Sequence, residues 1–323
     1  MQFSRELKIK SWLDEVLETH SYTMIAASSD ASFRRYFRVI LDKNSYIVMD
    51  APPELEDCGP FLQVAKLFEK AGVAVPKVIE SNLDEGFLLL SDLGDTTFLT
   101  VLDNETAPRL YDLATDALLT IQMASREHVL PEYDNVKLIN EMQLFPEWYL
   151  NRHLNLPEDR YQNIGLENMF SQLAEAAISQ AKVFVHRDFH SRNLMVLTDR
   201  AGVLDFQDAV YGPVTYDLVS LFRDAYISWD EEHVLDWLIR YWEKARKAGI
   251  PVPDDFSLFY RDFEWMGMQR HLKILGIFAR LNYRDGKNFY LKDIPLVLDY
   301  VLQVARRYRE FSFLYRLLSE SLT

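Results

Sequence analysis

Cysteine is nearly absent from this chain of 323 residues, which contains only Cys58. An internal disulfide is therefore impossible, and the cysteine usage gives no sign of an oxidising compartment. Cys58 follows the acidic run "ELED", and neighbouring carboxylates raise the pKa of a thiol. We therefore do not expect a catalytic or redox role for this cysteine.

Long apolar runs and an excess of positive charge are also lacking. The first 25 residues contain no continuous apolar segment like that of a signal peptide. No stretch approaches the roughly 18 apolar residues that a membrane span needs. The formal net charge of −14 argues against non-specific binding to nucleic acid. We therefore expect a cytoplasmic protein that binds neither nucleic acid nor membrane and has no obligate protein partner.

The chain does contain enough apolar residues, 49%, for a substantial core, and its length favours two lobes. The first part predicts a small sheet with helices, at 5–20, 35–41, 45–49, 59–72, 75–81 and 86–93. The later part predicts helices at 104–125, 166–181, 233–249, 256–281 and 295–320, interrupted by a strand–loop–strand unit at 183–206. We expect an N-terminal lobe of residues 1–93, a helical lobe of residues 94–323, and a ligand between them.

Two acids and an amide stand out in "HRDFHSRN" and the later "VLDFQDA". Asp188 is expected on a loop, Asn193 at the start of a strand, and Asp205 at the end of its hairpin partner. Asn193 and Asp205 could then converge on Mg²⁺, which favours a few oxygen ligands, while Asp188 accepts a hydroxyl proton. A lone Asp–x4–Asn is usually turn chemistry. The full pattern, with its apolar strand and Leu–Asp–Phe, is far more specific and predicts catalysis or nucleotide binding.

These motifs, with "YGPVTYDL" after them, resemble the aminoglycoside phosphotransferase family, relatives of the protein kinases. The resemblance covers nearly the whole chain. It implies an α+β, bilobal protein-kinase-like fold that uses ATP and Mg²⁺. It also implies that Asp188 is the catalytic base, that Asn193 and Asp205 are metal ligands, and that His186 and Asp217 are structural. His190 is left open between a loop brace and an acceptor contact.

The lysine that kinases carry on the third strand is missing. Its position is expected at Met49, and the partner glutamate of the helix at Phe61. Their joint loss is reasonable because a buried carboxylate without its cation would be costly. Either one of three nearby arginines replaces the lysine, or all are solvated strand charges. These arginines are Arg34, Arg35 and Arg38.

The expected nucleotide loop, "SSDASFRRYFRV", has no glycine, but its small and turn-forming residues still suit a close approach of backbone to phosphate. By resemblance, Ser91 and Leu93 meet the adenine edge, with Leu90 behind it. The predicted nucleotide-binding residues are Ser32, Phe33, Arg34, Arg38, Ser91 and Leu93.

A further resemblance narrows the family. "DASFRRYFRV", "MDAPPE" and "WMGMQRHLKILGIFARLNYRDGK" are similar to one branch of bacterial kinases. These phosphorylate the anomeric hydroxyl of N-acetylmuramate and N-acetylglucosamine in cell-wall recycling. The strand without lysine is normal in that branch, which argues against an inactive kinase.

A basic stripe is predicted on the helix at 256–281 and just beyond it. At 100° per residue, it spans an arc of about 140° and comprises Trp265, Gln269, Arg270, Lys273, Arg280 and Arg284. Such a stripe suits an anionic sugar, because Trp covers a ring face, Gln binds hydroxyls and Arg binds a carboxylate. We predict acceptor contacts from its first five members and from His190. The alternative is a solvated face with ion pairs. The stripe disfavours aminoglycosides and choline, which are cationic acceptors.

The sequence therefore favours an ATP- and Mg²⁺-dependent sugar kinase. Two alternatives remain. The acceptor could be another small molecule or a protein hydroxyl, or the chain could be a nucleotide-binding pseudokinase. The presence of Asp188, Asn193 and Asp205 favours an enzyme, since a scaffold has no chemical need for all three.

Overall fold

A computed structural model describes residues 2–29, 33–162 and 165–321. The chain forms two compact units. The first comprises Met1–Thr97 with Leu194–Asp208, and the second comprises Phe98–Asn193 with Ala209–Thr323. The predicted lobes met at residue 93, whereas the first unit runs to Thr97 and also includes the later hairpin.

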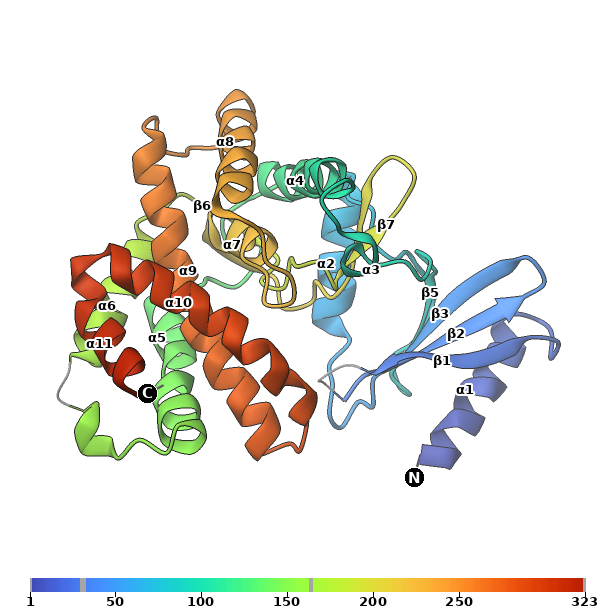
Figure 1. Cartoon of the computed structure of the whole chain (residues 1–323). Coiled ribbons are helices and arrows are strands. Elements are labelled where there is room, and N and C mark those ends of the chain that lie inside the picture. The colour runs from blue at the N-terminus through green and yellow to red at the C-terminus, as the bar shows by residue number, and fades with distance from the viewer. Residues whose placement is uncertain (1, 30–32, 163–164, 322–323) are drawn as a thin grey trace. The chain divides into compact units, whose positions relative to one another are not determined.

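The first unit is built on an antiparallel sheet with the strand order β1-β2-β3-β5-β4 (Figure 1). Its strands are β1 (Thr23–Ser29), β2 (Arg35–Leu41), β3 (Asn44–Asp50), β4 (Val78–Asn82) and β5 (Phe87–Ser91). The hairpin of β7 (Leu194–Val196) and β8 (Ala201–Val203) and the helices α1 (Gln2–Val16) and α2 (Gly59–Ala71) complete it. Strand β1 was not predicted, and α1 ends four residues before the predicted end at residue 20. The predicted hairpin of β2 and β3 is confirmed.

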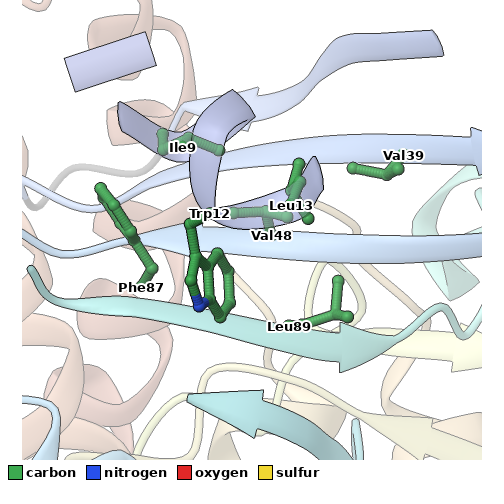
Figure 2. Packing of buried hydrophobic residues seen from close by; sticks show 7 residues of the cluster. All are labelled: Ile9, Trp12, Leu13, Val39, Val48, Phe87 and Leu89. Atoms are coloured by element: carbon green, nitrogen blue, oxygen red, sulfur yellow. The ribbon is translucent and has the colours of Figure 1, made fainter. Parts of the chain in front are cut away.

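Helix α1 packs on one face of this sheet. Figure 2 shows Ile9, Trp12 and Leu13 of α1 against side chains from β2, β3 and β5. Strand alternation puts these sheet residues on one face, and they are Val39, Val48, Phe87 and Leu89. The rings of Trp12 and Phe87 are 5.7 Å apart. This small core fixes the sheet from which the predicted nucleotide residues extend.

Helix α2 ends as the sequence predicted. Gly72 follows it with a left-handed φ of 96°, and the Gly72 amide bonds back to Glu69. Glycine suits this position because it adopts positive φ without a steric penalty.

The second unit is mainly helical. Its helices are α3 (Phe98–Val101), α4 (Ala107–Met123), α5 (Asn135–Met142), α6 (Leu166–Ile178), α7 (Tyr216–Phe222), α8 (Glu231–Lys247), α9 (Phe256–Tyr283), α10 (Ile294–Arg307) and α11 (Ser312–Ser321). It also contains β6 (Lys182–Val185) paired with β9 (Val210–Pro213), a π-helix η1 (Phe145–His153), and the short 3₁₀ helices η2 (Glu158–Arg160), η3 (Asn288–Asp293) and η4 (Arg309–Phe311). Helices α5 and α7 were not predicted.

One predicted helix is wrong. We expected an uninterrupted helix over residues 295–320, but Tyr308 is extended, with φ −108° and ψ 127°. Helix α10 therefore ends at Arg307, and α11 begins at Ser312. The hydroxyl of Tyr308 donates to Glu264 at 2.7 Å. The break is therefore accompanied by a tertiary contact, which helical periodicity in the sequence does not reveal.

Helix α9 is the centre of this unit and lies beside α10 (Figure 1). Every residue from Phe263 to Gly276 is buried, because α9 packs against α5, α6, α7, α10 and η1. A Cβ at Gly276 would lie 2.4 Å from the backbone of Leu144, so the close crossing requires glycine. Within the described ranges, no helix combines the length and apolar character that crossing a membrane requires.

Candidate active site

The loop after β6 folds back on Asp188. The backbone carbonyl of Asp188 accepts from the His190 amide at 3.0 Å and from the Asn193 side-chain Nδ2 at 3.0 Å. The Asn193 amide in turn donates to the His190 carbonyl at 2.9 Å. These turns place the Asn193 side chain against Asp188 and make Oδ1 the amide atom that could ligate a cation.

Arg187 holds the loop in an uncommon backbone conformation. Its φ is 79°, a left-handed value that costs on the order of 1–3 kcal/mol for a residue with a side chain. The carboxylate of Asp217, on α7, accepts from the amides of His186 at 2.6 Å and Arg187 at 3.0 Å. Arg270 donates to the Arg187 carbonyl at 2.8 Å. The strained residue is therefore fixed from both sides.

Asp188 itself is accessible and strongly ionised. Its side chain is 42% exposed, and Arg270 lies 3.8 Å from its carboxylate. Desolvation by the surrounding residues opposes ionisation, but the positive charges of Arg270 and Lys273 help to outweigh it and lower the pKa of Asp188 to about 2. A carboxylate with so low a pKa is a weak base. Its larger contribution would be to orient a hydroxyl for attack.

A buried cluster, called here the Glu141 cluster, lies behind Asp188. Glu141, on α5, accepts hydrogen bonds from Arg187 and Tyr133, and the ammonium of Lys273 lies 3.1 Å away. The Tyr216 hydroxyl accepts from Lys273 at 3.2 Å. Arg270 completes the cluster by donating to the same hydroxyl at 3.1 Å. Burial opposes the ionisation of Glu141, but the nearby charges of Lys273 and Arg187 lower its pKa.

The predicted basic stripe is divided by these contacts. Arg270 and Lys273 join the surroundings of Asp188. Trp265 instead packs 5.0 Å from the Phe311 ring, and Gln269 donates to the Leu138 carbonyl at 3.5 Å. Arg280 is half-buried with no hydrogen-bond partner for its Nε among the described residues. The alternative of a solvated face with ion pairs is wrong for the first four members of the stripe, which are buried, but it describes Arg284, which is exposed and pairs with Asp285.

Asp205 lies in the first unit. It has a left-handed φ of 63° and accepts from the Gln207 side chain at 2.9 Å. The next residue, Phe206, packs 4.9 Å from Phe61 and 6.0 Å from Phe68, both on α2. The ring of Phe206 thus anchors the turn that carries Asp205.

The residues expected in place of the kinase lysine and glutamate are part of the apolar core. Met49 is fully buried between Tyr36 and Leu88 in the sheet register, and Phe61 is 4% exposed. An unpaired ionised side chain at either position would meet a large desolvation penalty. The interior of this unit therefore suits two apolar side chains.

All three candidate replacement arginines have acidic partners. Arg34 lies 3.5 Å from Glu56. Arg35 lies 2.5 Å from Asp50. Arg38 binds both carboxylate oxygens of Asp92, at 2.6 and 3.1 Å, and donates to the Gly94 carbonyl at 2.7 Å. In the sheet register Arg35 and Arg38 lie on opposite faces.

Asp92 lies between the two residues predicted to meet adenine. Ser91 exchanges hydrogen bonds with Lys77, each at 2.9 Å. The Leu93 side chain lies close to Gly202, since a Cβ added to Gly202 would lie 3.0 Å from it. Arg38 therefore braces this segment through Asp92. Phe33 is 65% exposed and its amide donates to Glu56 at 3.0 Å. Ser32 lies outside the described residues.

The side-chain oxygens of Asn193 and Asp205 are of the chemical type that binds magnesium. An amide oxygen of Asn193 and a carboxylate of Asp205 are the hard oxygen ligands that Mg²⁺ prefers, with waters and phosphate oxygens in its other positions. The described residues contain no group of three or more His, Cys, Asp or Glu side chains that could hold a metal by themselves. Asn193 belongs to the second unit and Asp205 to the first.

Several residues of the site were missed from sequence. Glu141 lies on a short helix that was not predicted, and Tyr216 stands inside a recognised motif without a distinguishing pattern. Sequence gives no local signal for either, because their partners Arg187 and Lys273 come from distant segments.

The architecture is that of the protein-kinase-like fold. A choline kinase from Streptococcus pneumoniae has a TM-score of 0.67 at 14% identity, covering 92% of this chain and 99% of that chain. An ADP-bound aminoglycoside phosphotransferase has a TM-score of 0.61 at 14% identity, covering 91% of this chain and 97% of that one.

The chain belongs to the phosphotransferase enzyme family, which matches residues 23–254. An N-acetylmuramate/N-acetylglucosamine kinase of Neisseria meningitidis serogroup B is 51% identical over 98% of this chain and 96% of that protein. The kinase of the same name from Pseudomonas putida is 46% identical over 96% of this chain and 94% of that protein. The resemblance to the aminoglycoside phosphotransferases and their amino-sugar kinase branch is thereby confirmed.

Proposed function

We propose that this protein transfers the γ-phosphoryl group of ATP to the anomeric hydroxyl of N-acetylmuramate or N-acetylglucosamine. The observation that carries the proposal is the near-full-length identity of 51% to a kinase named for these two sugars. The accessible carboxylate of Asp188, on a loop held from behind by α5, α7 and α9, supports it. We further propose that the protein acts in the cytoplasm, where ATP is available.

Each residue would have a distinct role. Asp188 orients the sugar hydroxyl and receives its proton as the oxygen attacks phosphorus. Asn193 and Asp205 would hold Mg²⁺, which neutralises charge on the phosphates when bound. His186 and Asp217 maintain the loop. ATP would contact the residues predicted from sequence, namely Ser32, Phe33, Arg34, Arg38, Ser91 and Leu93.

Phosphorus NMR tests this proposal directly. The purified protein is incubated with MgATP and, in separate samples, N-acetylmuramate, N-acetylglucosamine, kanamycin or choline. We expect a new sugar phosphate signal, coupled to the anomeric proton, with the two amino sugars alone. The methyl glycoside of N-acetylglucosamine lacks a free anomeric hydroxyl and should not react. Turnover of that glycoside would refute the anomeric position, and turnover of kanamycin or choline alone would refute the acceptor class.

A further inference from the structure

The cations first expected to bind an acceptor carboxylate are already engaged. Arg270 and Lys273 are 4% and 7% exposed. Both donate to the Tyr216 hydroxyl, and Lys273 also pairs with Glu141. A ligand carboxylate could reach them only by displacing buried partners, which leaves an uncompensated charge behind. Another cation near Asp188 is better suited to this task.

Arg192 is such a cation. It precedes Asn193 in the loop that folds back on Asp188, and its side chain is 33% exposed. Its guanidinium lies 3.4 Å from the centre of the Tyr226 ring. It donates no hydrogen bond to any residue that the structure describes. A guanidinium that is held over an aromatic ring, and whose N–H groups make no hydrogen bond within the described chain, is suited to binding a carboxylate.

Asp293, at the start of α10, is a loose partner of Arg192. Its Oδ2 is 3.9 Å from the guanidinium, too far for a hydrogen bond. This oxygen is buried and has no hydrogen-bond partner among the described residues. The opposite charges of Arg192 and Asp293 therefore balance. The N–H groups of Arg192 remain available as donors, and Oδ2 of Asp293 remains available as an acceptor. Buried polar atoms without partners are uncommon and call for a ligand or water.

Tyr226 connects this pair to Asp188. Its ring lies 5.3 Å from that of His190, whose Nδ1 is also buried and unpartnered within the described chain. The His190 amide in turn donates to the Asp188 carbonyl at 3.0 Å. The ring of Phe278 lies 6.3 Å from that of Tyr226. Aromatic rings beside polar groups that lack a hydrogen-bond partner are typical of sugar-binding sites.

We propose that Arg192 binds the carboxylate of an N-acetylmuramate acceptor, and that Asp293 balances the charge of Arg192 when N-acetylglucosamine, which has no carboxylate, binds instead. This inference rests on the proposed function. It explains how one site accepts an anionic and a neutral sugar. The carboxylate of N-acetylmuramate would use the hydrogen-bond donors of Arg192 that Asp293 leaves free, and Asp293 remains the counter-charge of Arg192 when N-acetylglucosamine binds.

The two residues should then shift acceptor preference in opposite directions. Kinetic constants are measured for both sugars and for MgATP with the wild type, Arg192→Gln, Arg192→Lys and Asp293→Asn. Arg192→Gln should raise KM for N-acetylmuramate about tenfold, as expected for a lost charged hydrogen bond, with KM for N-acetylglucosamine and MgATP nearly unchanged. Arg192→Lys should retain part of the N-acetylmuramate affinity. Asp293→Asn should favour N-acetylmuramate over N-acetylglucosamine in kcat/KM.

Arg240→Gln serves as the matched control, because Arg240 is exposed on α8 and pairs only with Asp236 among the described residues. Thermal melting establishes that each variant is folded. Equal losses for both sugars in Arg192→Gln, or a change in KM for MgATP instead, would overturn the inference. A wild type that phosphorylates N-acetylglucosamine alone would also overturn it while the proposed function stands. A wild type inactive on both sugars would end both proposals.

Discussion

Each compact unit contains a buried carboxylate held between two cations. In the first unit, Asp50 receives Arg5 on one oxygen and Arg35 on the other, each at 2.5 Å. In the second unit, Glu141 receives Arg187 and Lys273. In both arrangements two cations face one buried carboxylate, yet they hold different parts of the molecule.

The difference lies in where the cations come from. Arg5 belongs to α1 and Arg35 to β2, and Arg5 also stacks 5.0 Å from the Phe87 ring. The Asp50 cluster therefore fastens a helix to the sheet. Arg187 directly precedes Asp188, so the Glu141 cluster fastens the loop that carries Asp188 to α5 and α9. The same kind of buried ion cluster thus joins a helix to a sheet in one unit and holds the loop of Asp188 in the other.

The largest effect is expected at Asp188, which the Glu141 cluster positions. Asp188→Asn removes the proton acceptor and should lower kcat about 10²- to 10⁴-fold. Its unfolding temperature should fall only slightly, because Asn no longer offsets the charge of Arg270 but the Asp188 side chain is 42% exposed. Sugar phosphate formation and thermal melting measure the two quantities. A variant with near-normal kcat would show that Asp188 does not receive the proton of the sugar hydroxyl.

Glu141→Gln should weaken both stability and catalysis. It leaves Arg187 and Lys273 buried without their counter-charge, which should reduce the free energy of unfolding by about 3–5 kcal/mol. The loss of the ion pair between Glu141 and Arg187 should also lower kcat, because the backbone of Arg187 positions Asp188. Urea denaturation and initial rates measure the effects, with Glu175→Gln on the exposed face of α6 as the control. An unchanged kcat would mean that the cluster serves the fold alone.

Asp50→Asn should affect stability only. Asp50 is fully buried between Arg5 and Arg35, and its loss should cost about 3 kcal/mol, reduced because both arginines are partly exposed. Below the melting temperature, kcat and both KM values should match the wild type. Urea denaturation and kinetics at low temperature test this. A large loss of kcat in the folded variant would remove the contrast between the two clusters.

His271 tests a buried basic residue that has no carboxylate partner in the described chain. Burial lowers the pKa of His271 to about 3. Its Nε2 lies 3.1 Å from the Arg223 carbonyl and must donate to it, while its Nδ1 is buried without a partner among the described residues. A proton at Nδ1 is therefore unfavourable in the folded state.

Only the unfolded state binds this proton between about pH 6.5 and pH 3, so stability should fall as pH decreases through that range. The contribution of His271 should be on the order of 3 kcal/mol between pH 7 and pH 4. His271→Phe should lose less stability over that interval, measured by urea denaturation at each pH. Parallel curves for the two proteins would show that His271 becomes protonated in the fold.

Local sequence predicted the elements whose conformation depends on near neighbours. The loop with Asp188 and Asn193, the hairpin of β2 and β3, and the stop at Gly72 all follow from residues close in the chain. Strand β1 was missed because strands depend on partners elsewhere in the sheet. The break at Tyr308 was missed because its contact, Glu264, lies on another helix.

The sequence by itself determined the family, the chemical motifs and the set of residues that share one side of α9. Helical periodicity specifies that Arg270 and Lys273 lie on the same face, but it does not specify what covers that face. The tertiary structure decided that the face is buried, because Glu141 and Tyr216 arrive from distant segments to compensate its charges. Burial of a cation depends on a partner in space, and only the folded chain brings that partner to it.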